Sequence, residues 1–367
     1  MKIRAAVLEE FGKPLNVTEL DLAEPRAGEV LVRLAACGVC HTDMYTASGA
    51  DPTGYAPTVL GHEGAGFVER VGEGVTSVAP GDLVVTLFSP QCRECIHCQS
   101  TETNLCLAIR EQQNLGYLPD GTARLSRDGE PIRHFMGCST FAEYTVMPEI
   151  ALAKVPRETP PDRACLFACG LSTGLGAALN TARVRPGSTC VVFGAGMVGL
   201  GAVAGCRLSG AERVICVDLS PDRLELARGQ GATETWIADE HTVARVIEET
   251  GGFGADYTFE ATGLVAVMRQ AVEAARMGWG LCTIAGVAGR GETLDVIPRW
   301  LITGRRICGS SFGGVKGRDQ VPELVGLYLD GRLDVDAFIS HRIGLDDVNR
   351  GFELMENQDG IRSVIEL

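Results

Sequence analysis

Four cysteines of this 367-residue chain are spaced as metal ligands are. They are Cys92, Cys95, Cys98 and Cys106, in the pattern C-x2-C-x2-C-x7-C. Four thiolates this close can surround one tetrahedral zinc ion in a closed structural site. An iron–sulfur cluster is the rival, but the bacterial ferredoxin run continues x3-C-P, whereas here seven residues intervene and Leu107 follows. Chance clustering of buried thiols is the third interpretation, and the spacing favours a structural zinc lobe at residues 89–107.

A glycine-rich turn indicates a second kind of chemistry, the binding of a dinucleotide. The turn reads Gly194-Ala195-Gly196-Met197-Val198-Gly199, after an apolar run at residues 190–193 and before a helical stretch. In this context Gly194 permits the tight turn, Gly196 lets the backbone approach a pyrophosphate, and Gly199 lets helix and strand pack closely. A glycine turn with a purely structural role is the alternative.

The residues around this turn indicate which dinucleotide would bind. Met197 and Val198 open the helix, whose N-terminus faces the pyrophosphate. Asp218, at the end of the next apolar strand, should accept hydrogen bonds from both ribose hydroxyls and repel a 2′-phosphate. NAD is therefore favoured over NADP, although Arg223 would soften that preference by reaching toward the adenosine side.

A catalytic zinc site needs three protein ligands and one open position. Outside the lobe the candidates are Cys37, Cys40, His41, His62, Cys138, Cys165 and Cys169. Spacing does not choose among them, because the possible partners are far apart in the sequence. Taken singly, a cysteine or histidine packs in a core more often than it binds a metal.

Chain length, net charge and composition limit the possible classes of protein. A chain of 367 residues is long for one core, so two domains are expected. The net charge of −14 argues against nucleic acid and anionic membrane surfaces as partners. The N-terminus has no apolar run of signal-peptide length, and the apolar stretch at 191–203 is too short to span a bilayer. Fourteen cysteines without a leader favour a reducing cytoplasm, with metal binding and buried thiols rather than disulfides.

The elements that must position these residues follow two different patterns. The first part has short strands at residues 30–34, 66–71 and 82–87, which indicate a β barrel or sandwich with long loops. From about Leu171, strands at residues 190–193, 213–218, 255–260 and 280–285 alternate with helices, which predicts a parallel sheet. One helix should cover 221–230, with Ser220 as its N-cap and Pro221 at its first position. A first domain that resumes after about Gly313 would fit the end of the chain.

Taken together, these motifs resemble the zinc-dependent medium-chain alcohol dehydrogenase family over essentially the whole chain. Within it the chain is most similar to class III, the glutathione-dependent formaldehyde dehydrogenases. The resemblance implies an α/β protein with a β-rich GroES-like catalytic domain (1–170 and 314–367) and a Rossmann NAD-binding domain with a doubly wound parallel sheet (171–313). The matching segments, besides the lobe, the glycine turn and Asp218, are residues 38–43, 48–52, 61–63, 104–106 with 109–110, 136–141, 169–174, 312–316 and 361–363.

The resemblance also implies a role for individual residues. Cys40, His62 and Cys169 would bind the catalytic zinc, which gives two zinc ions per chain. Glu63 would be an acid close to that metal; a helix-start acid is its alternative role. Thr42 would pass the alcohol proton toward solvent, and His41 and Arg362 would contact the cofactor pyrophosphate. His41 would also take part in the proton relay, because Tyr45 occupies the position where similar enzymes often carry a histidine.

The expected substrate site departs from class III. Asp51 and Arg110 are kept, but a glutamate of the class is Thr53 here and a pocket tyrosine is Phe88. We therefore expect Asp51, Phe88 and Arg110 at the substrate. The first hypothesis is hydride transfer to NAD from an alcohol or thiol hemiacetal such as S-(hydroxymethyl)glutathione.

Two other functions and an assembly complete the expectations. A primary or aryl alcohol dehydrogenase without thiol dependence is the alternative enzyme, and a non-enzymatic zinc or nucleotide-binding protein belongs to another class. We expect a homodimer, with a tetramer as the second option. Residues 301–309 would pair across its two-fold axis as an edge strand.

Overall fold

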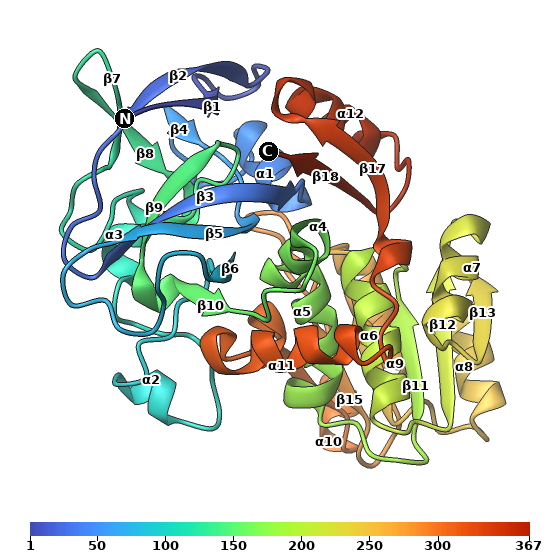
Figure 1. Ribbon diagram of the computed structural model, residues 1–367. Helices are drawn as coiled ribbons and strands as arrows, with labels where there is room; N and C mark the ends of the chain where they lie inside the picture. The colour runs from blue at the N-terminus through green and yellow to red at the C-terminus, as the bar shows by residue number, and fades with distance from the viewer. The chain divides into compact units, whose positions relative to one another are not determined.

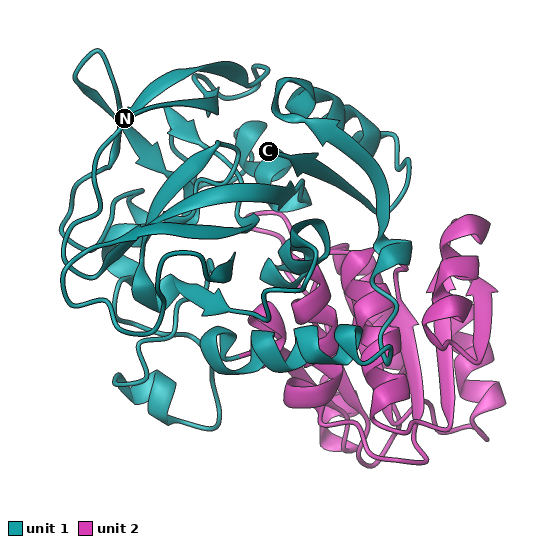
Figure 2. Ribbon diagram, in the orientation of Figure 1, with its two compact units in different colours: residues 1–169, 316–367 teal, residues 170–315 magenta.

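The computed structural model describes all residues, 1–367, and the chain folds into two compact units (Figure 2). Unit 1 contains Met1–Cys169 and Lys316–Leu367, and unit 2 contains Gly170–Val315. Unit 1 is therefore discontinuous in sequence, and unit 2 is inserted into it.

Unit 1 consists mainly of strands, with short helices between them (Figure 1). Its strands are β1 (Lys2–Leu8), β2 (Asn16–Leu22), β3 (Glu29–Gly38), β4 (Thr58–Val59), β5 (Glu63–Val71), β6 (Leu83–Thr86), β7 (Leu125–Arg127), β8 (Glu130–His134), β9 (Tyr144–Pro148), β10 (Leu152–Lys154), β17 (Ile339–Gly344) and β18 (Arg362–Glu366). Its α-helices are α1 (His41–Ala47), α2 (Ile96–Gln99), α3 (Arg110–Asn114), α4 (Pro161–Ala164), α11 (Gly317–Leu329) and α12 (Val348–Glu356). Single 3-10 turns are η1 (Phe135–Gly137), η2 (Glu149–Ala151), η3 (Cys165–Ala168), η6 (Asp336–Phe338) and η7 (Leu345–Asp347).

Two sheets organise unit 1. Strands β1, β2, β7, β8 and β4 close into a barrel. The strands predicted at 30–34, 66–71 and 82–87 are present, but as parts of β3, β5 and β6 they belong to the other sheet. The other sheet has the order β10-β6-β5-β3-β18-β17, with β9 also paired to β3. β3 is its central strand, because it pairs antiparallel with β5, β9 and β18. Val30 and Val32 pack in one hydrophobic cluster and Leu31, between them, packs in another, so this part of β3 is covered on both faces.

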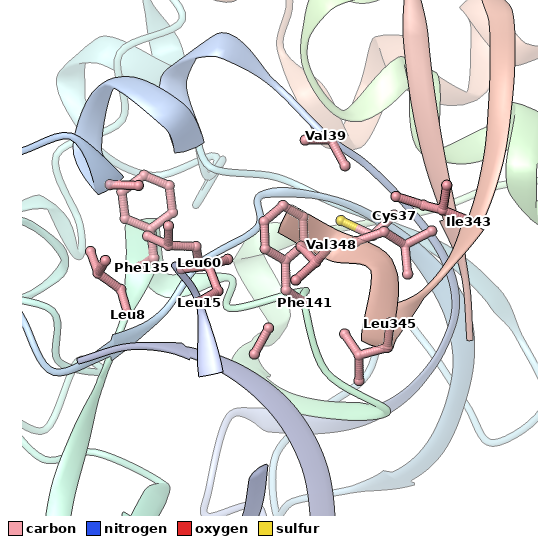
Figure 3. Packing of buried hydrophobic residues seen from close by; sticks show 13 residues of the cluster. Leu8, Leu15, Cys37, Val39, Leu60, Phe135, Phe141, Ile343, Leu345 and Val348 are labelled. Carbon is pink, nitrogen blue, oxygen red and sulfur yellow. The ribbon is translucent and has the colours of Figure 1, made fainter. Parts of the chain in front are cut away.

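One hydrophobic cluster of unit 1 joins the two ends of the chain. Leu8, Leu60 and Phe141 pack together with Leu345 and Val348 from the C-terminal segment (Figure 3). The C-terminal segment therefore contributes both a sheet strand and core side chains to unit 1.

Unit 2 is a six-stranded parallel sheet with helices between successive strands (Figure 1). Its elements are α5 (Gly170–Gly176), the π-helical turn η4 (Ala177–Ala182), β11 (Thr189–Phe193), α6 (Met197–Leu208), β12 (Arg213–Asp218), α7 (Pro221–Gln230), β13 (Glu234–Ile237), α8 (Thr242–Glu249), β14 (Tyr257–Glu260), α9 (Val265–Ala274), β15 (Leu281–Ile284), α10 (Pro298–Ile302), β16 (Arg306–Gly309) and the 3-10 turn η5 (Ser311–Gly314). The order is β13-β12-β11-β14-β15-β16, and every pairing is parallel. This is the order of a doubly wound dinucleotide-binding sheet, whose chain reverses direction across the sheet between β11 and β14.

The predicted helix at 221–230 is confirmed as α7, and the Ser220 side chain caps it by accepting from the Arg223 amide. The single β segment predicted at 301–309 is wrong in its first half. Residues Leu301 and Ile302 instead complete helix α10, which Pro298 opens at its first turn. The chain turns at Gly304, with φ +96°, before edge strand β16 begins. Glu63 begins strand β5, so the alternative role of a helix-start acid is also wrong.

No single helix is long and apolar enough to cross a membrane. A bent pair of helices, at 161–168 and 170–182, passes the same test of length and composition, but most of its residues are buried, as in the core helices of other folds.

A buried histidine makes the stability of unit 1 sensitive to acid. His134 is fully buried, and its Nε2 accepts a hydrogen bond of 3.0 Å from the Arg124 amide, so the ring is neutral with its proton on Nδ1. Burial, together with the neighbouring charge of Arg124, lowers the pKa of His134 to about 3. The unfolded chain, with a histidine pKa of about 6.5, takes up a proton that the folded chain excludes.

We therefore predict that the stabilising contribution of neutral His134 is complete above about pH 6.5 and lost by about 1.4 kcal/mol per pH unit below it. The free energy of unfolding should fall less steeply for His134→Gln than for the wild type between about pH 6.5 and about pH 5. Urea unfolding at several pH values measures the two slopes. His241→Gln, at an exposed histidine, is the control and should keep the wild-type slope. Equal slopes for His134→Gln and the wild type would contradict the prediction.

Candidate metal and cofactor sites

The four cysteines of the lobe come together as a ligand set. The Sγ atoms of Cys92, Cys95, Cys98 and Cys106 all lie within 4.8 Å of one another. Cys92 and Cys98 are 3.8 Å apart, and Cys95 and Cys106 are 4.0 Å apart. A zinc ion with bonds of about 2.3 Å to four sulfurs requires sulfur–sulfur edges of about 3.8 Å, whereas a disulfide bond is only about 2.05 Å long. The lobe therefore fits a closed tetrahedral zinc site.

Backbone amides of the lobe point at its sulfurs. The amides of Glu94 and Cys95 donate to Cys92 Sγ, at 3.4 and 3.3 Å, and the amide of Cys98 donates to Cys95 Sγ at 3.4 Å. Burial opposes ionisation of Cys95, but amide donors lower its pKa to about 6. These amides stabilise thiolates, the form that binds a metal.

Two side chains attach the lobe to the N-terminal end of α11. Lys316 Nζ donates to the carbonyl oxygens of Cys98 and Ser100, at 2.7 and 2.6 Å. Arg93 forms an ion pair of 2.6 Å with Asp319. The lobe is therefore fastened to the C-terminal part of unit 1.

A second ligand set lies at one end of the sheet of unit 1. Atoms of Cys40, His62, Glu63 and Cys169 lie within 4.8 Å of one another. The pairing of β3 with β5 sets Gly38 opposite Glu63, so the residues that follow β3 and precede β5 meet at the same sheet end. A Cβ on Gly38 would lie 2.1 Å from Glu63 Oε2, so only glycine leaves room for this carboxylate. Cys169, the last residue of this part of unit 1, completes the set.

Asp43, for which no role was expected from the sequence, orients the histidine of this set. Its buried carboxylate pairs with His62 Nδ1 at 3.0 Å and accepts from the amides of Cys40, at 3.1 Å, and Gly61, at 3.0 Å. Because Nδ1 is engaged, Nε2 is the nitrogen left for a metal. A signal was present in the sequence, since an acid three residues after a helix N-cap reaches back to the cap amide.

The electrostatics of the set suit a cation. A hydrogen bond from Cys169 lowers the pKa of Cys40 well below its usual range, in spite of burial. Burial disfavours protonation of His62, but the charges of Asp43 and Cys40 outweigh it and raise the pKa of His62. Two sulfurs, an oriented imidazole and a neighbouring carboxylate form the donor set that proteins use for catalytic zinc.

Glu63 and Arg362 form a buried pair beside the ligands. Arg362 Nη2 lies 3.2 Å from Glu63 Oε1, and both side chains are almost fully buried. Burial raises the pKa of Glu63 to about 8, although Arg362 opposes that shift. The Nε of Arg362 is also buried and makes no hydrogen bond, so the guanidinium keeps an unused donor.

The remaining residues expected in catalysis lie on α1. The Thr42 hydroxyl is 3.8 Å from Cys40 Sγ, so it borders the ligand set. His41 is exposed at the first position of the helix, and Tyr45 is half-buried one turn later.

The expected substrate residues have three different environments. The ring of Phe88 packs edge-on against the ring of His62, with centroids 5.7 Å apart. Asp51 accepts hydrogen bonds from the hydroxyls of Thr46 and Thr53, both at 2.8 Å. Arg110, at the start of α3, is exposed and forms no ion pair. No hydrogen bond or ion pair joins Asp51 to Arg110.

The glycine turn of unit 2 has the shape expected for a pyrophosphate cradle. Gly194 has φ +96°, and a Cβ on Gly199 would lie 1.7 Å from the Gly194 carbonyl oxygen. A Cβ on Gly196 would project into open space, the space that a phosphate would occupy. Gly196 is also the N-cap of α6, which begins with Met197 and Val198. The turn therefore fits a dinucleotide.

Two side chains next to this turn were expected at the cofactor. The Asp218 carboxylate, at the carboxyl end of β12, accepts from the amides of Ala195 and Ser220, at 2.6 and 2.9 Å. Arg223 is half-buried in the first turn of α7. Asp218 thus stands at the edge of the sheet where ligands bind in this fold.

Comparison with known proteins agrees with these sites. Residues 26–157 match the family model of the alcohol dehydrogenase GroES-like domain, and residues 197–330 match that of the zinc-binding dehydrogenases. Alcohol dehydrogenase class-3 of Myxine glutinosa is 50% identical over 99% of this chain and 97% of its own length. The S-(hydroxymethyl)glutathione dehydrogenases of Synechocystis sp. and Paracoccus denitrificans are each 49% identical over 100% of both chains.

Solved structures show the same similarity. An alcohol dehydrogenase zinc-binding domain protein from Burkholderia ambifaria superposes with a TM-score of 0.94 at 35% identity, covering 100% of this chain and 99% of its own. Benzyl alcohol dehydrogenase from Acinetobacter calcoaceticus superposes with a TM-score of 0.92 at 31% identity, with the same coverage. The chain therefore belongs to the zinc-dependent medium-chain alcohol dehydrogenase family, and its class III members are among its relatives.

Proposed function

We propose that the protein oxidises S-(hydroxymethyl)glutathione, or a closely similar thiol adduct of formaldehyde, with NAD as hydride acceptor. The observation that carries the proposal is the ligand set of buried Cys40 and His62 with half-buried Cys169, bordered by the Thr42 hydroxyl. The class III relatives, at about half identity over the full length, supply the substrate class.

Cys40, His62 and Cys169 would hold the catalytic zinc. When bound, zinc polarises an alcohol oxygen and lowers the pKa of its hydroxyl, which makes hydride transfer possible near neutral pH. Asp43 keeps the imidazole of His62 in the orientation that presents Nε2. Glu63 adds a negative charge next to the ligands, and Arg362 balances it.

Thr42, whose hydroxyl borders the ligand set, would accept the hydroxyl proton of the substrate. Its side chain is half-buried, whereas His41, the residue before it, is exposed. A proton received at Thr42 would leave through the cofactor ribose and His41, or through water. Tyr45 offers a phenol rather than an imidazole at the position where similar enzymes often carry a histidine, so we do not assign it the end of this path.

Each unit would serve one half of the reaction. Unit 1 would be the catalytic domain, in which the four-cysteine lobe holds a structural zinc with no open position for substrate. Unit 2 would be the NAD-binding domain, with the pyrophosphate at Gly194, Gly196 and Gly199 and the adenosine ribose at Asp218. Arg362 and His41, both in unit 1, would contact the pyrophosphate, and Arg223 would lie toward the adenosine.

Arg110 would recognise the negative charge of the substrate. It is the expected substrate residue that is exposed and has no ion pair, and guanidinium groups bind carboxylates well. Asp51 is engaged by Thr46 and Thr53, so it would act mainly by shaping its loop beside the substrate.

An aryl or primary alcohol dehydrogenase without thiol dependence is the second candidate. Phe88 favours it, because an apolar ring rather than a tyrosine hydroxyl faces His62. The close superposition on benzyl alcohol dehydrogenase points in the same direction.

We further propose a homodimer in the cytoplasm, with a tetramer as the second option. The outer edge of β16 has no strand partner in the chain, and the nearby side chains of Leu301 and Ile302 are exposed to 47% and 83%. Such an edge next to apolar side chains favours pairing with a second copy about a two-fold axis. All fourteen cysteines are free thiols, which agrees with a reducing compartment.

The first prediction of the proposed function concerns metal content. The wild-type protein should contain two zinc ions per chain, and Cys169→Ala should lose one of them together with alcohol oxidation, because a zinc site with two remaining ligands binds weakly. Elemental analysis of the purified proteins measures the stoichiometry. Cys165→Ala, at a buried thiol outside the ligand set, is the control and should keep both ions. A single zinc in the wild type would instead support a binding protein without catalysis.

The second prediction concerns the substrate. Formaldehyde oxidation should be much faster with glutathione than without it, and equal rates would exclude a thiol adduct as substrate. Arg110→Ala should raise KM about tenfold or more for an ω-hydroxy carboxylic acid, the loss expected for one charge-assisted hydrogen bond. The KM for an uncharged primary alcohol of the same length should rise much less. Arg350→Ala, at an exposed arginine on α12, is the control.

The third prediction concerns assembly. Ile302→Glu should convert the dimer to a monomer, because it places a charge in the contact between two copies. Sedimentation velocity measures the change. Ile96→Glu, which alters an apolar side chain on the lobe that is exposed to 73%, should leave the dimer intact. A dimer that survives Ile302→Glu at low protein concentration would place the interface elsewhere.

A further inference from the structure

A single side-chain amide connects three segments around the catalytic ligand set. Gln113 Nε2 donates to the carbonyl oxygen of Phe88 at 2.9 Å and to that of Met136 at 2.7 Å. Gln113 lies in α3, three residues after Arg110, so both side chains belong to the same short helix. The two donated bonds use both hydrogens of the amide nitrogen.

The two carbonyls belong to the segments that bracket His62. Phe88 packs edge-on against the imidazole, and Phe135, which precedes Met136, does the same from another segment with centroids 5.9 Å apart. Gln113 thus connects α3 to the two segments whose phenylalanine rings pack against His62. The distance from Arg110 to the reacting centre depends on this connection.

The segment that contains Met136 needs such support. Met136 has φ 52° and Ser139 has φ 50°, a conformation that residues with a β-carbon rarely adopt. Hydrogen bonds hold the turn in place: Ser139 Oγ donates to the Val59 carbonyl oxygen, and Gln113 donates to the Met136 carbonyl oxygen. Backbone in this region persists where its surroundings determine it, and it gathers at functional sites.

We propose that Gln113 is a positioning residue that sets the placement of Arg110 relative to the catalytic ligand set and so selects alcohols with a distant negative charge. The inference rests on the proposed function, in which Arg110 binds the anionic end of the substrate. Gln113 itself touches no reacting atom. Its amide acts by holding the helix that carries the guanidinium at a fixed distance from His62.

The test compares an ω-hydroxy carboxylic acid with an uncharged primary alcohol of the same length. Gln113→Met keeps the length of the side chain but removes both donors, and Gln113→Glu keeps the shape but faces a carboxylate toward two carbonyl oxygens. In both variants the ratio of kcat/KM for the acid to kcat/KM for the alcohol should fall about tenfold, the size of one weakened charge-assisted hydrogen bond. The loss should lie in KM for the acid rather than in kcat.

Gln112→Met is the matched control, because Gln112 is the preceding residue of α3 and its side chain makes no hydrogen bond within the chain. It should keep the wild-type ratio.

A purely structural role for Gln113 predicts a lower midpoint of thermal unfolding and equal losses for both substrates, and that result would overturn the inference. Arg110→Ala, measured in parallel, separates the two claims. If Arg110→Ala lowers the ratio and the Gln113 variants do not, the inference fails and the proposed function stands; if Arg110→Ala leaves the ratio unchanged, the proposed function fails first.

Discussion

The catalytic ligand set depends on the buried carboxylate of Asp43. It accepts from the amides of Cys40 and Gly61 and pairs with His62 Nδ1, so one side chain fixes the backbone next to one ligand and the ring of another. The loop after β3 and the loop before β5 are therefore tied together where the sheet brings their ends close. Removing such a carboxylate would leave buried donors without partners, which costs about 1–3 kcal/mol for each.

Charge balance explains why the site needs both a metal and an arginine. If both sulfurs and both carboxylates were ionised, Cys40, Cys169, Asp43 and Glu63 would carry four negative charges close together, whereas Arg362 contributes one positive charge. Unpaired charges of this kind are not stable in a protein interior. Without a metal, the negative charges of Asp43 and Cys40 contribute to the raised pKa values of His62 and Glu63. A divalent cation would remove most of the excess negative charge.

The sequence predicted those features that local spacing controls. The four lobe cysteines lie on one loop, the glycine turn follows its strand directly, and Ser220 with Pro221 marks the start of α7, so each pattern is visible in a short window. Cys40, His62 and Cys169 lie on three distant segments, and only the family resemblance could select them before the structure brought them together. Gln113 gave no local signal, because its partners are backbone carbonyls of two other segments. The strand predicted at 301–309 was wrong in its first half because apolar residues occur in both strands and helices. Pro298, three residues before the segment, favours the start of a helix there.

The contact between Lys316 and the lobe has a consequence for the order in which the protein forms. Lys316 follows Cys98 by 218 residues, so all of unit 2 is synthesised between the lobe and the side chain that fastens it. On the ribosome, where N-terminal parts of a chain fold first, the lobe exists for a long interval without its anchor. During that interval the metal alone must keep the four cysteines together, and the lysine then secures a loop that is already closed. Zinc bound during synthesis would therefore close the lobe before the last part of unit 1, Lys316–Leu367, emerges.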